Sequence, residues 1–369
     1  MSDTGRFIRN VLIKALLLFL AADALFAWVR PMAALDRISL YNRIVPGRVR
    51  LPYGEHPSSD YSLSLFNLDA MFASHEIAAT PVPAKEFRVV LIGDSSTWGF
   101  LLQPDQTMGA LINRSGADPV RVYNLGYPTM SVTKDLLMMQ SALRYHPDLI
   151  IWLVTLESLP QEKQLDSPIL QHNADDVRGL IARYGLRSDA ADPRLINPTF
   201  WDRTINGERR ELADLVRLQM YGFLWAATGV DQSIPASYDP PQKDLDPDPS
   251  FHGRLPPTLS PDDLALDVLN AGREIAGAIP VWIVNEPIYV STGRNSDIRY
   301  NFFYPRWAYD QYRDILAQWC RDHNVYYLDA WDKVPAEDFS NSAIHRTPEG
   351  EALMAGILEA AIREGRNVR

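Results

Sequence analysis

Short apolar runs alternate with helical segments along most of the chain. The runs are rich in Val, Ile, Leu and aromatic residues and occupy positions 88–92, 120–124, 149–154, 280–285 and 325–328. Between and after them, the segments at 131–145, 307–323 and 348–363 carry apolar residues at the three- to four-residue spacing of helices. Strands that alternate with helices predict βαβ units, and therefore an α/β fold with a mostly parallel sheet.

The N-terminal segment predicts a single membrane-spanning helix. Only Lys14 and Asp23 are charged in Val11–Val29, whose length falls within the roughly 17–25 residues that a helix needs to cross the hydrocarbon core. Arg6 and Arg9 precede the segment, which favours a cytoplasmic N-terminus and an extracytoplasmic main domain. We therefore expect residues 1–30 to form a single-pass membrane anchor.

Two other interpretations of this segment stay open. Ala22-Asp23-Ala24 fits the small-x-small pattern of a signal-peptide cleavage site, in which case the apolar segment is removed. Alternatively, the segment is a buried core helix, in which Lys14 and Asp23 would each need a polar partner. Both the anchor and the signal interpretation place the rest of the chain outside the cytoplasm.

The remainder divides into a lead-in and one main domain. Residues 31–85 contain scattered aromatic residues and prolines without sustained periodicity, so we expect a lead-in that packs on the domain. Residues 86–369 hold the predicted strands, interrupted by an insertion at about 160–278. Within it, 233–261 is dense in Pro and Asp and predicts an exposed loop. The segment 213–230 predicts a packing helix, with a lid or a second membrane contact as alternatives.

Charge and cysteine content exclude several classes of function. The chain has 36 Lys and Arg against 46 Asp and Glu, a formal charge of −10, so we expect no nucleic-acid partner. The lone Cys320 excludes an intrachain disulfide framework and a multi-cysteine zinc site. The spacing of His, Asp and Glu residues indicates no metal site either. We expect no metal and no cofactor.

The first candidate for chemistry is a turn of hydroxyl residues after the first strand. Gly93-Asp94-Ser95-Ser96-Thr97 follows the run at 88–92, at the carboxyl edge where a parallel sheet presents its ligand crevice. A serine hydroxyl there lies close to the start of a helix, whose N–H groups can stabilise an oxyanion. The alternative interpretation is that these side chains only cap the helix.

The second candidate is His345, which lies between the last strand and the C-terminal helix. Thr347 can cap that helix, with Pro348 in its first turn. A serine hydroxyl is a poor nucleophile until a base accepts its proton, and histidine is the usual base. A single loop histidine is most often a surface residue, so His345 becomes a candidate base only in combination with Ser95.

Together these segments resemble the SGNH (GDSL) hydrolase superfamily. Gly93-Asp94-Ser95 resembles its first block, in which the serine is the nucleophile. Asn124-Leu125-Gly126 resembles the second block, whose glycine amide contributes to the oxyanion hole. His345, followed by Thr347-Pro348, resembles the last block, which supplies the base.

The resemblance covers roughly residues 87–365, apart from the insertion. It implies a three-layer, flavodoxin-like sheet of five mostly parallel strands. It also implies that Ser95 and His345 form a catalytic pair, and that the amides of Ser95 and Gly126 line an oxyanion hole.

Two positions depart from the family pattern. The third block usually supplies an asparagine to the oxyanion hole, whereas Glu157 stands here and could donate a hydrogen bond only if protonated. The family usually places an aspartate three residues before the histidine, where this chain has Ser342. Ser342 is therefore the candidate for orienting the imidazole. The alternatives are Asp329, Asp332 and Asp338.

The resemblance implies a serine esterase or O-acyltransferase that acts on acyl esters. Membrane-anchored proteins of this family that modify cell-surface polymers suggest a cell-surface polysaccharide as substrate, by analogy of fold. The main alternative is an inactive protein of the same fold that binds or scaffolds a partner, because Glu157 and Ser342 depart from the pattern. A flavodoxin-like nucleotide module is a third hypothesis, which gives no role to His345.

Overall fold

The protein folds around a five-stranded sheet with strand order β2-β1-β3-β4-β5. The computed structural model describes residues 3–54, 63–79, 86–116 and 119–367. The strands are β1 (Phe87–Ile92), β2 (Val120–Asn124), β3 (Leu149–Val154), β4 (Val281–Asn285) and β5 (Tyr326–Asp329). Each adjacent pair is parallel, with Ile92 of β1 beside Trp152 of β3. The predicted α/β fold with a flavodoxin-like sheet is confirmed.

The α-helices among the described residues are α1 (Asp3–Val29), α2 (Met32–Leu35), α3 (Leu68–Ser74), α4 (Glu76–Ala79), α5 (Ser95–Trp98), α6 (Met108–Arg114), α7 (Val132–Ala142), α8 (Pro168–His172), α9 (Ala174–Tyr184), α10 (Arg209–Thr228), α11 (Leu266–Ala276), α12 (Arg306–Asp322) and α13 (Pro348–Asn367). Helices α7, α11 and α12 cover one face of this sheet and α6 and α13 the other, as strands without polar alternation require. Val90 and Ile92 pack in one layer with α7, α11 and α12, whereas Val89 and Leu91 pack in the other with α6 and α13.

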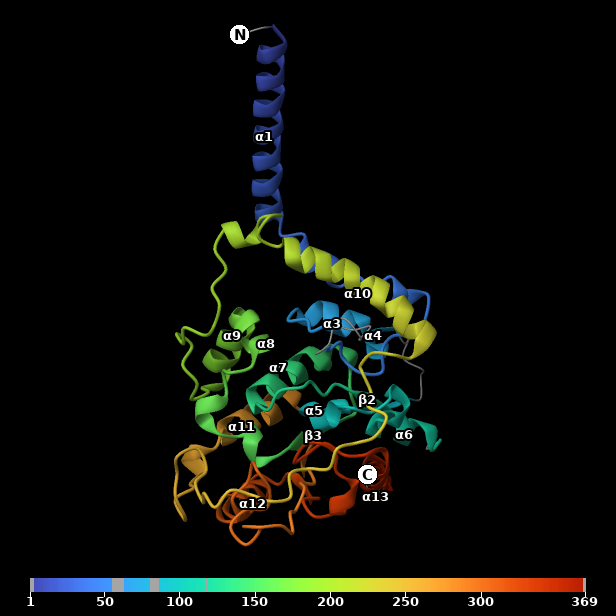
Figure 1. The fold of residues 1–369 in the computed structure, drawn as a ribbon, viewed down its shortest axis with the longest axis vertical. Coiled ribbons are helices and arrows are strands. Elements are labelled where there is room, and N and C mark those ends of the chain that lie inside the picture. Colours follow the sequence, from blue (N-terminus) through green and yellow to red (C-terminus); the bar gives the residue numbers. More distant parts are fainter. Residues whose placement is uncertain (1–2, 55–62, 80–85, 117–118, 368–369) are drawn as a thin grey trace.

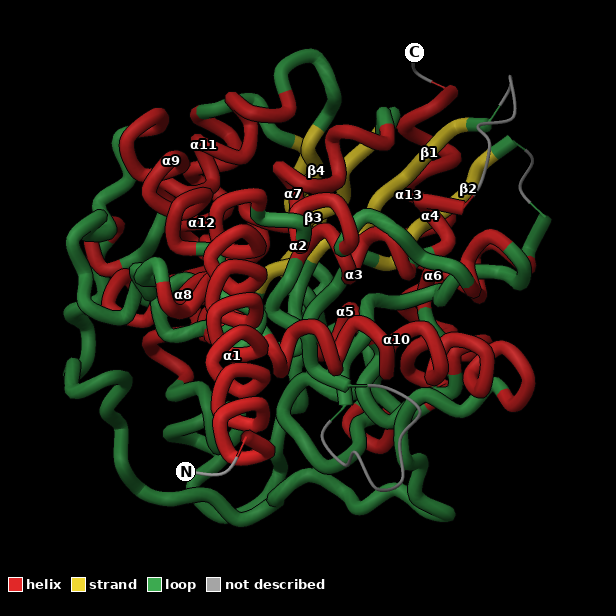
Figure 2. Tube along the Cα trace, turned by 90° about the horizontal axis from the view of Figure 1, so that it is seen from above, coloured by secondary structure: helices red, strands yellow, loops and turns green. Residues whose placement is uncertain are grey.

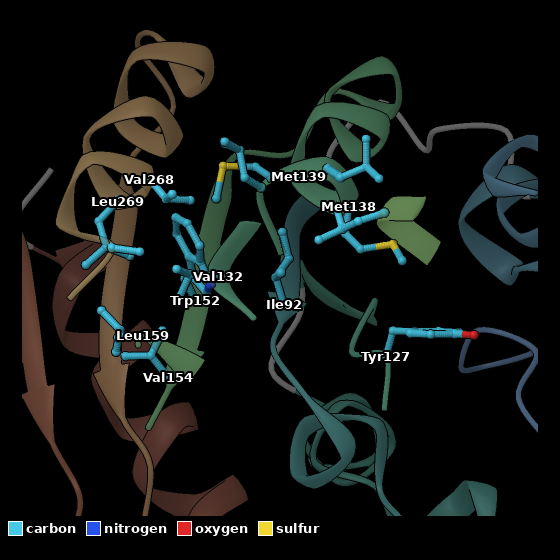
Figure 3. Close-up of a cluster of buried hydrophobic side chains, with 14 of the residues drawn as sticks. Ile92, Tyr127, Val132, Met138, Met139, Trp152, Val154, Leu159, Val268 and Leu269 are labelled. Carbon is cyan, nitrogen blue, oxygen red and sulfur yellow. The ribbon is translucent and has the colours of Figure 1, made fainter. Parts of the chain in front are cut away.

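The layer under α7 and α11 forms the larger core (Figure 3). Val268 and Leu269 of α11 face Trp152 of β3, and Met138 and Met139 of α7 lie over the neighbouring part of the sheet. The approach of α11 is so close that a Cβ on Gly272 would lie 2.4 Å from the Trp152 ring. This packing fixes β1 and β3, the two strands that lead into the candidate site.

The lead-in packs on the domain over its described part. Tyr41, Met71 and Phe72 are fully buried. His75 Nε2 lies 3.0 Å from the carbonyl oxygen of Asn124, at the end of β2. Positions 55–62 and 80–85 of the lead-in lie outside the described residues.

The segment 160–278, expected as an insertion, contains one element of the fold itself. α11 packs on α7 and leads into β4, so it is the crossover helix between β3 and β4. The segment 233–261 is irregular, as predicted, but it buries Leu245, Phe251 and Leu259. Most of its other residues are exposed, as its Pro and Asp content predicts, and these three side chains anchor the loop to the domain.

α1 projects from the domain as a separate helix (Figure 1). It is long and apolar enough to cross a membrane, with a mean hydropathy of 2.1 over its most apolar window. Asp23 and Ala27 are its buried residues, and the Asp23 carboxylate accepts the backbone N–H of Asn206 at 3.3 Å. The exposure of the other side chains excludes the core-helix interpretation. Seen from above, α10 lies across the same end of the domain (Figure 2).

Candidate active site

The candidate site lies where the strand order changes direction. The chain goes from β1 to β2 on one side and then to β3 on the other, and sheets of this kind bind ligands at such a switch point. Ser95 is the first residue of α5, directly after β1. Asp94 caps α5 by accepting the Ser96 N–H at 2.8 Å. Because Asp94 performs the capping, the half-buried Ser95 hydroxyl is free for another role.

The Ser95 hydroxyl and the His345 imidazole meet at this point. Ser95 Oγ lies 2.8 Å from His345 Nε2, although 250 positions separate the two residues in the chain. His345 lies in the loop before α13, and its half-buried ring packs on Phe100 with 4.7 Å between ring centroids. Proton transfer needs a separation of about 2.6–3.2 Å, so the pair is placed for direct transfer.

The second ring nitrogen of His345 faces Asn341. Nδ1 lies 3.2 Å from Asn341 Oδ1. When Ser95 donates to Nε2, the ring hydrogen resides on Nδ1 and is donated to the Asn341 oxygen, so both contacts fix one tautomer. The sequence had indicated Ser342 for this task, but the described contacts of the ring do not include Ser342. Asp329, one of the alternatives, pairs with Arg313 at 2.7 Å.

His345 is a neutral base throughout the neutral pH range. Burial, followed by the positive charge of Arg346, lowers the pKa of His345 from its usual 6.5 to about 3. The Asn341 side chain carries no charge that would compensate. The imidazole can therefore accept a proton at neutral pH, but the imidazolium that results is weakly stabilised.

A buried network joins the loops that carry Ser95 and His345. Arg346, directly after His345, donates to Ser96 Oγ at 2.9 Å and to the Ser96 carbonyl oxygen at 3.2 Å. Its Nε donates to Glu351 Oε2 at 2.7 Å, and both side chains are fully buried. The network thus holds the residue that follows each member of the Ser95–His345 pair.

Glu286, the residue after β4, completes this network. Its carboxyl accepts the Ser96 hydroxyl hydrogen and lies 3.7 Å from Arg346. Burial, followed by the neighbouring Asp94 carboxylate, raises the pKa of Glu286 well above its usual range despite the attraction of Arg346. The sequence pattern offered Ser96 only as a possible helix cap, and it did not single out Glu286, Asn341, Arg346 or Glu351, because polar residues in loops and helix starts do not reveal their burial or their partners.

Gly126 brings the loop after β2 against α5. A Cβ at this position would lie 2.6 Å from the backbone nitrogen of Trp98, so the approach requires glycine. The N–H of Gly126 donates to Asn124 Oδ1 at 3.0 Å. This bond conflicts with the oxyanion-hole role expected from the sequence. The N–H of Ser95, by contrast, has no acceptor among the contacts that the structure describes.

Glu157 follows β3 and is held by two basic groups. Its carboxylate contacts Lys163 Nζ and lies 3.0 Å from His252 Nε2. Burial raises the pKa of Glu157, but the hydrogen bonds from His252 and Lys163 outweigh burial and hold the pKa below its usual value. Glu157 is therefore ionised at neutral pH and cannot donate a hydrogen bond. Among the described residues, no group of three or more acidic, His or Cys side chains is arranged for a metal ion.

A pocket of about 260 Å³ reaches the residues that surround His345, although Ser95 and His345 themselves do not line it. Phe100 and Asn341, which both contact His345, belong to its wall. The rest of the wall combines aromatic, amide, hydroxyl and carboxylate groups: Tyr53, Trp98, Gln232, Ser233, Ser237 and Asp239 among others. Such a lining suits a ligand that has both apolar surface and hydrogen-bonding groups.

No family model and no curated protein matches the chain. Similar solved structures include a member of the lipolytic protein G-D-S-L family from Veillonella parvula, with 11% identity over 74% of this chain and 96% of that chain, at a TM-score of 0.35. A carbohydrate acetylesterase from Sinorhizobium meliloti shows 12% identity over 76% and 99% of the two chains, at 0.35. The aryl esterase of M. smegmatis shows 13% identity over 75% and 98%, at 0.34.

Proposed function

We propose that the protein is a membrane-anchored, extracytoplasmic serine esterase or O-acyltransferase. The observation that carries this proposal is the 2.8 Å contact between Ser95 Oγ and His345 Nε2. The hydrogen bonds from Arg346 to Ser96 support the proposal, because they join the residues that follow His345 and Ser95 and so hold the two side chains close together.

In the first half-reaction, Ser95 Oγ attacks the carbonyl carbon of an ester while His345 Nε2 takes the hydroxyl proton. The carbonyl oxygen becomes an oxyanion, to which the Ser95 N–H donates. The bond between the carbonyl carbon and the alcohol oxygen then breaks, and His345 returns its proton to the departing alcohol. The acyl group stays on Ser95.

In the second half-reaction, His345 takes a proton from an acceptor hydroxyl, whose oxygen attacks the acyl carbon. The bond to Ser95 Oγ breaks, and the proton passes from His345 back to Ser95. Water as acceptor gives hydrolysis, and a sugar hydroxyl gives acyl transfer. The aromatic and hydrogen-bonding lining of the pocket near His345 is compatible with an acylated sugar, and the proposed anchor points to a sugar of the cell surface.

The proposed oxyanion hole is weaker than the sequence resemblance implies. The N–H of Gly126 is not a donor in this proposal, because it is bonded to Asn124 Oδ1. Glu157, beyond the end of β3, is ionised and would oppose a developing negative charge. Its ion pair with Lys163 reduces that opposition. We therefore expect slow turnover of simple esters.

The N-terminal helix supports the anchoring part of the proposal. Asp23, at the centre of the possible cleavage site, is buried against the domain together with Ala27. Cleavage after Ala24 would remove Asp23 together with its contact to Asn206 and would leave Ala27 near a new chain end. We propose that residues 1–30 stay attached as an anchor, and that the lead-in 31–85 and the domain 86–369 lie outside the cytoplasm.

The hydrolysis of p-nitrophenyl acetate by the purified full-length protein tests the chemistry. We expect Ser95→Ala to lower kcat/KM by about 10³-fold or more. Ser188→Ala, which removes a hydroxyl that has no described contact with the site, should leave it unchanged. Equal rates for wild type and Ser95→Ala would refute the esterase mechanism.

A non-catalytic binding protein is the second candidate function. It is favoured by the uncharged Asn341 at Nδ1 of His345 and by the ionised Glu157, both of which weaken catalysis. This candidate predicts no Ser95-dependent hydrolysis of any acyl ester, together with binding of a glycan or protein in the pocket.

A further inference from the structure

α10 carries an apolar stripe on its outer face. Val216, Met220 and Phe223 recur at helical spacing, and their exposed fractions are 59%, 60% and 40%. The opposite face is buried, since Leu218 is 1% exposed and a Cβ on Gly222 would lie only 2.1 Å from the Tyr41 ring. A surface helix of a globular protein normally turns polar residues outward. The outer face of α10 is apolar although the inner face already packs on the domain.

The chain beside α10 extends this apolar surface. Leu40 N–H donates to Gln219 Oε1 at 2.7 Å, which fixes the segment of the lead-in along the helix. Ile38, Leu40 and Ile44 in that segment are 37%, 54% and 73% exposed. We define the α10 surface as Ile38, Leu40, Ile44, Val216, Met220, Phe223 and Leu224.

The α10 surface lies at the end of the domain from which α1 rises. Figure 1 shows α10 running from the foot of α1 across that end, and Figure 2 shows it crossing the same face seen from above. Trp28, near the end of α1, is 80% exposed, and Trp201, in the turn that contacts α1, is 70% exposed. Tryptophan is the residue that membrane proteins enrich at the boundary between headgroups and hydrocarbon.

Exposed arginines border the α10 surface. Arg30 and Arg37 follow α1, Arg43 lies beside Ile44, and Arg209 and Arg217 belong to α10. All five are exposed, in a chain whose net charge is −10. An apolar stripe bordered by Arg and Trp is the pattern of a helix that lies in a membrane interface, where the arginines contact anionic headgroups.

We infer that α10 lies flat in the interface of the bilayer that α1 spans, with the α10 surface among the headgroups and upper acyl chains. The occupant is thus the lipid bilayer, and the inference rests on the proposed anchor. α1 crosses the bilayer and α10 lies along its surface, so the two helices together hold the domain in one orientation. The pair Ser95–His345 is then held in a fixed orientation relative to the membrane.

Fluorescence from a labelled residue on α10 tests this inference in the full-length protein. Met220→Cys is labelled with the environment-sensitive dye NBD, and the protein is inserted into phosphatidylcholine–phosphatidylglycerol vesicles. Val216→Cys serves as a second position on the stripe. Leu353→Cys is the control, since Leu353 is 46% exposed on α13, at the end of the domain remote from α1 (Figure 1). The native Cys320 is buried and does not compete for the label.

We expect vesicles with brominated acyl chains to quench the labels at 220 and 216 about twofold or more, and to leave the label at 353 unquenched. Unquenched labels at 220 and 216 in protein that floats with the vesicles would overturn the α10 inference and leave the anchor intact. Labels shielded from a soluble quencher but not quenched by brominated lipid would overturn it in favour of a second copy of the chain. Protein that fails to float would overturn both anchor and inference. None of these results depends on esterase activity.

Discussion

Nδ1 of His345 lies 3.2 Å from an amide oxygen of Asn341 and has no described carboxylate partner. This relationship sets the character of the site. The amide fixes the imidazole tautomer as an aspartate would, but it adds no negative charge to stabilise the imidazolium that forms during catalysis. Burial and Arg346 lower the pKa of His345, and no carboxylate at Nδ1 opposes them. The weakly stabilised imidazolium is thus a second reason, beside the weak oxyanion hole, for the slow turnover that we expect.

Asn341→Asp should therefore accelerate the reaction. A carboxylate at this position raises the pKa of His345 from about 3 toward its usual value. It also stabilises the imidazolium in the transition state, so we expect kcat for p-nitrophenyl acetate to rise about tenfold or more. Asn341→Ala should lower kcat, since it frees the ring to rotate. A rate for Asn341→Asp at or below that of wild type would show that Asn341 does not face the catalytic imidazole.

The pH dependence of kcat/KM gives a second test. Because the pKa of His345 in the folded protein is about 3, nearly all of the imidazole is already in the neutral, basic form at pH 5. We expect kcat/KM of wild type to lack the inflection near pH 6.5 that an ordinary histidine base produces. Asn341→Asp should introduce such an acid limb. An inflection near pH 6.5 in wild type would contradict the environment assigned to His345.

Arg346 should matter for both stability and catalysis. Arg346→Met removes the cation between Glu351 and Glu286 and breaks both contacts to Ser96. Breaking a buried pair in this way costs about 3–5 kcal/mol, and kcat should fall because the Ser95 and His345 loops lose their link. Urea unfolding and kcat measured on the same samples test both effects.

Arg363→Met provides the matched control for Arg346. Arg363 pairs with Glu359 on the exposed face of α13, and such surface pairs contribute about 0–1 kcal/mol. If Arg346→Met were as mild as this control, the buried network would not hold the site together.

Glu157→Gln should increase activity. The substitution removes a negative charge that the contacts of His252 and Lys163 keep ionised, and it supplies an amide N–H that can donate to an oxyanion. We expect kcat/KM to rise about tenfold, which corresponds to ~1.4 kcal/mol in the activation barrier. Glu162→Gln is the control, because that residue pairs with Arg254. A lower rate specific to Glu157→Gln would assign the carboxylate a supporting role instead.

The sequence predicted those features that a local pattern determines. The bounds of β3 were predictable to the residue. A continuous apolar run that follows Pro147-Asp148 is typical of a strand covered by helices on both faces. Ser95 and His345 were predictable because each stands beside a strand or helix end in a recognisable block. Features that depend on side-chain direction were not predictable. Nothing local distinguishes Asn341 from Ser342 as the partner of Nδ1.

The insertion illustrates the same limit. Its helix α11 has the spacing of an ordinary amphipathic helix, and only its packing on α7 identifies it as the crossover to β4. Gly126 is another example, because its N–H could face an oxyanion until the structure shows it bonded to Asn124. The direction of a single amide is decided by the tertiary arrangement of its loop.

Covalent labelling by a fluorophosphonate, mapped by mass spectrometry of the digested full-length protein, tests the central claim most directly. The reagent reacts with a serine whose proton a neighbouring base can remove. The account predicts a single adduct on Ser95 in wild type, with labelling slowed strongly in His345→Ala. Absence of an adduct on Ser95, or labelling at the same rate without the imidazole, would contradict it.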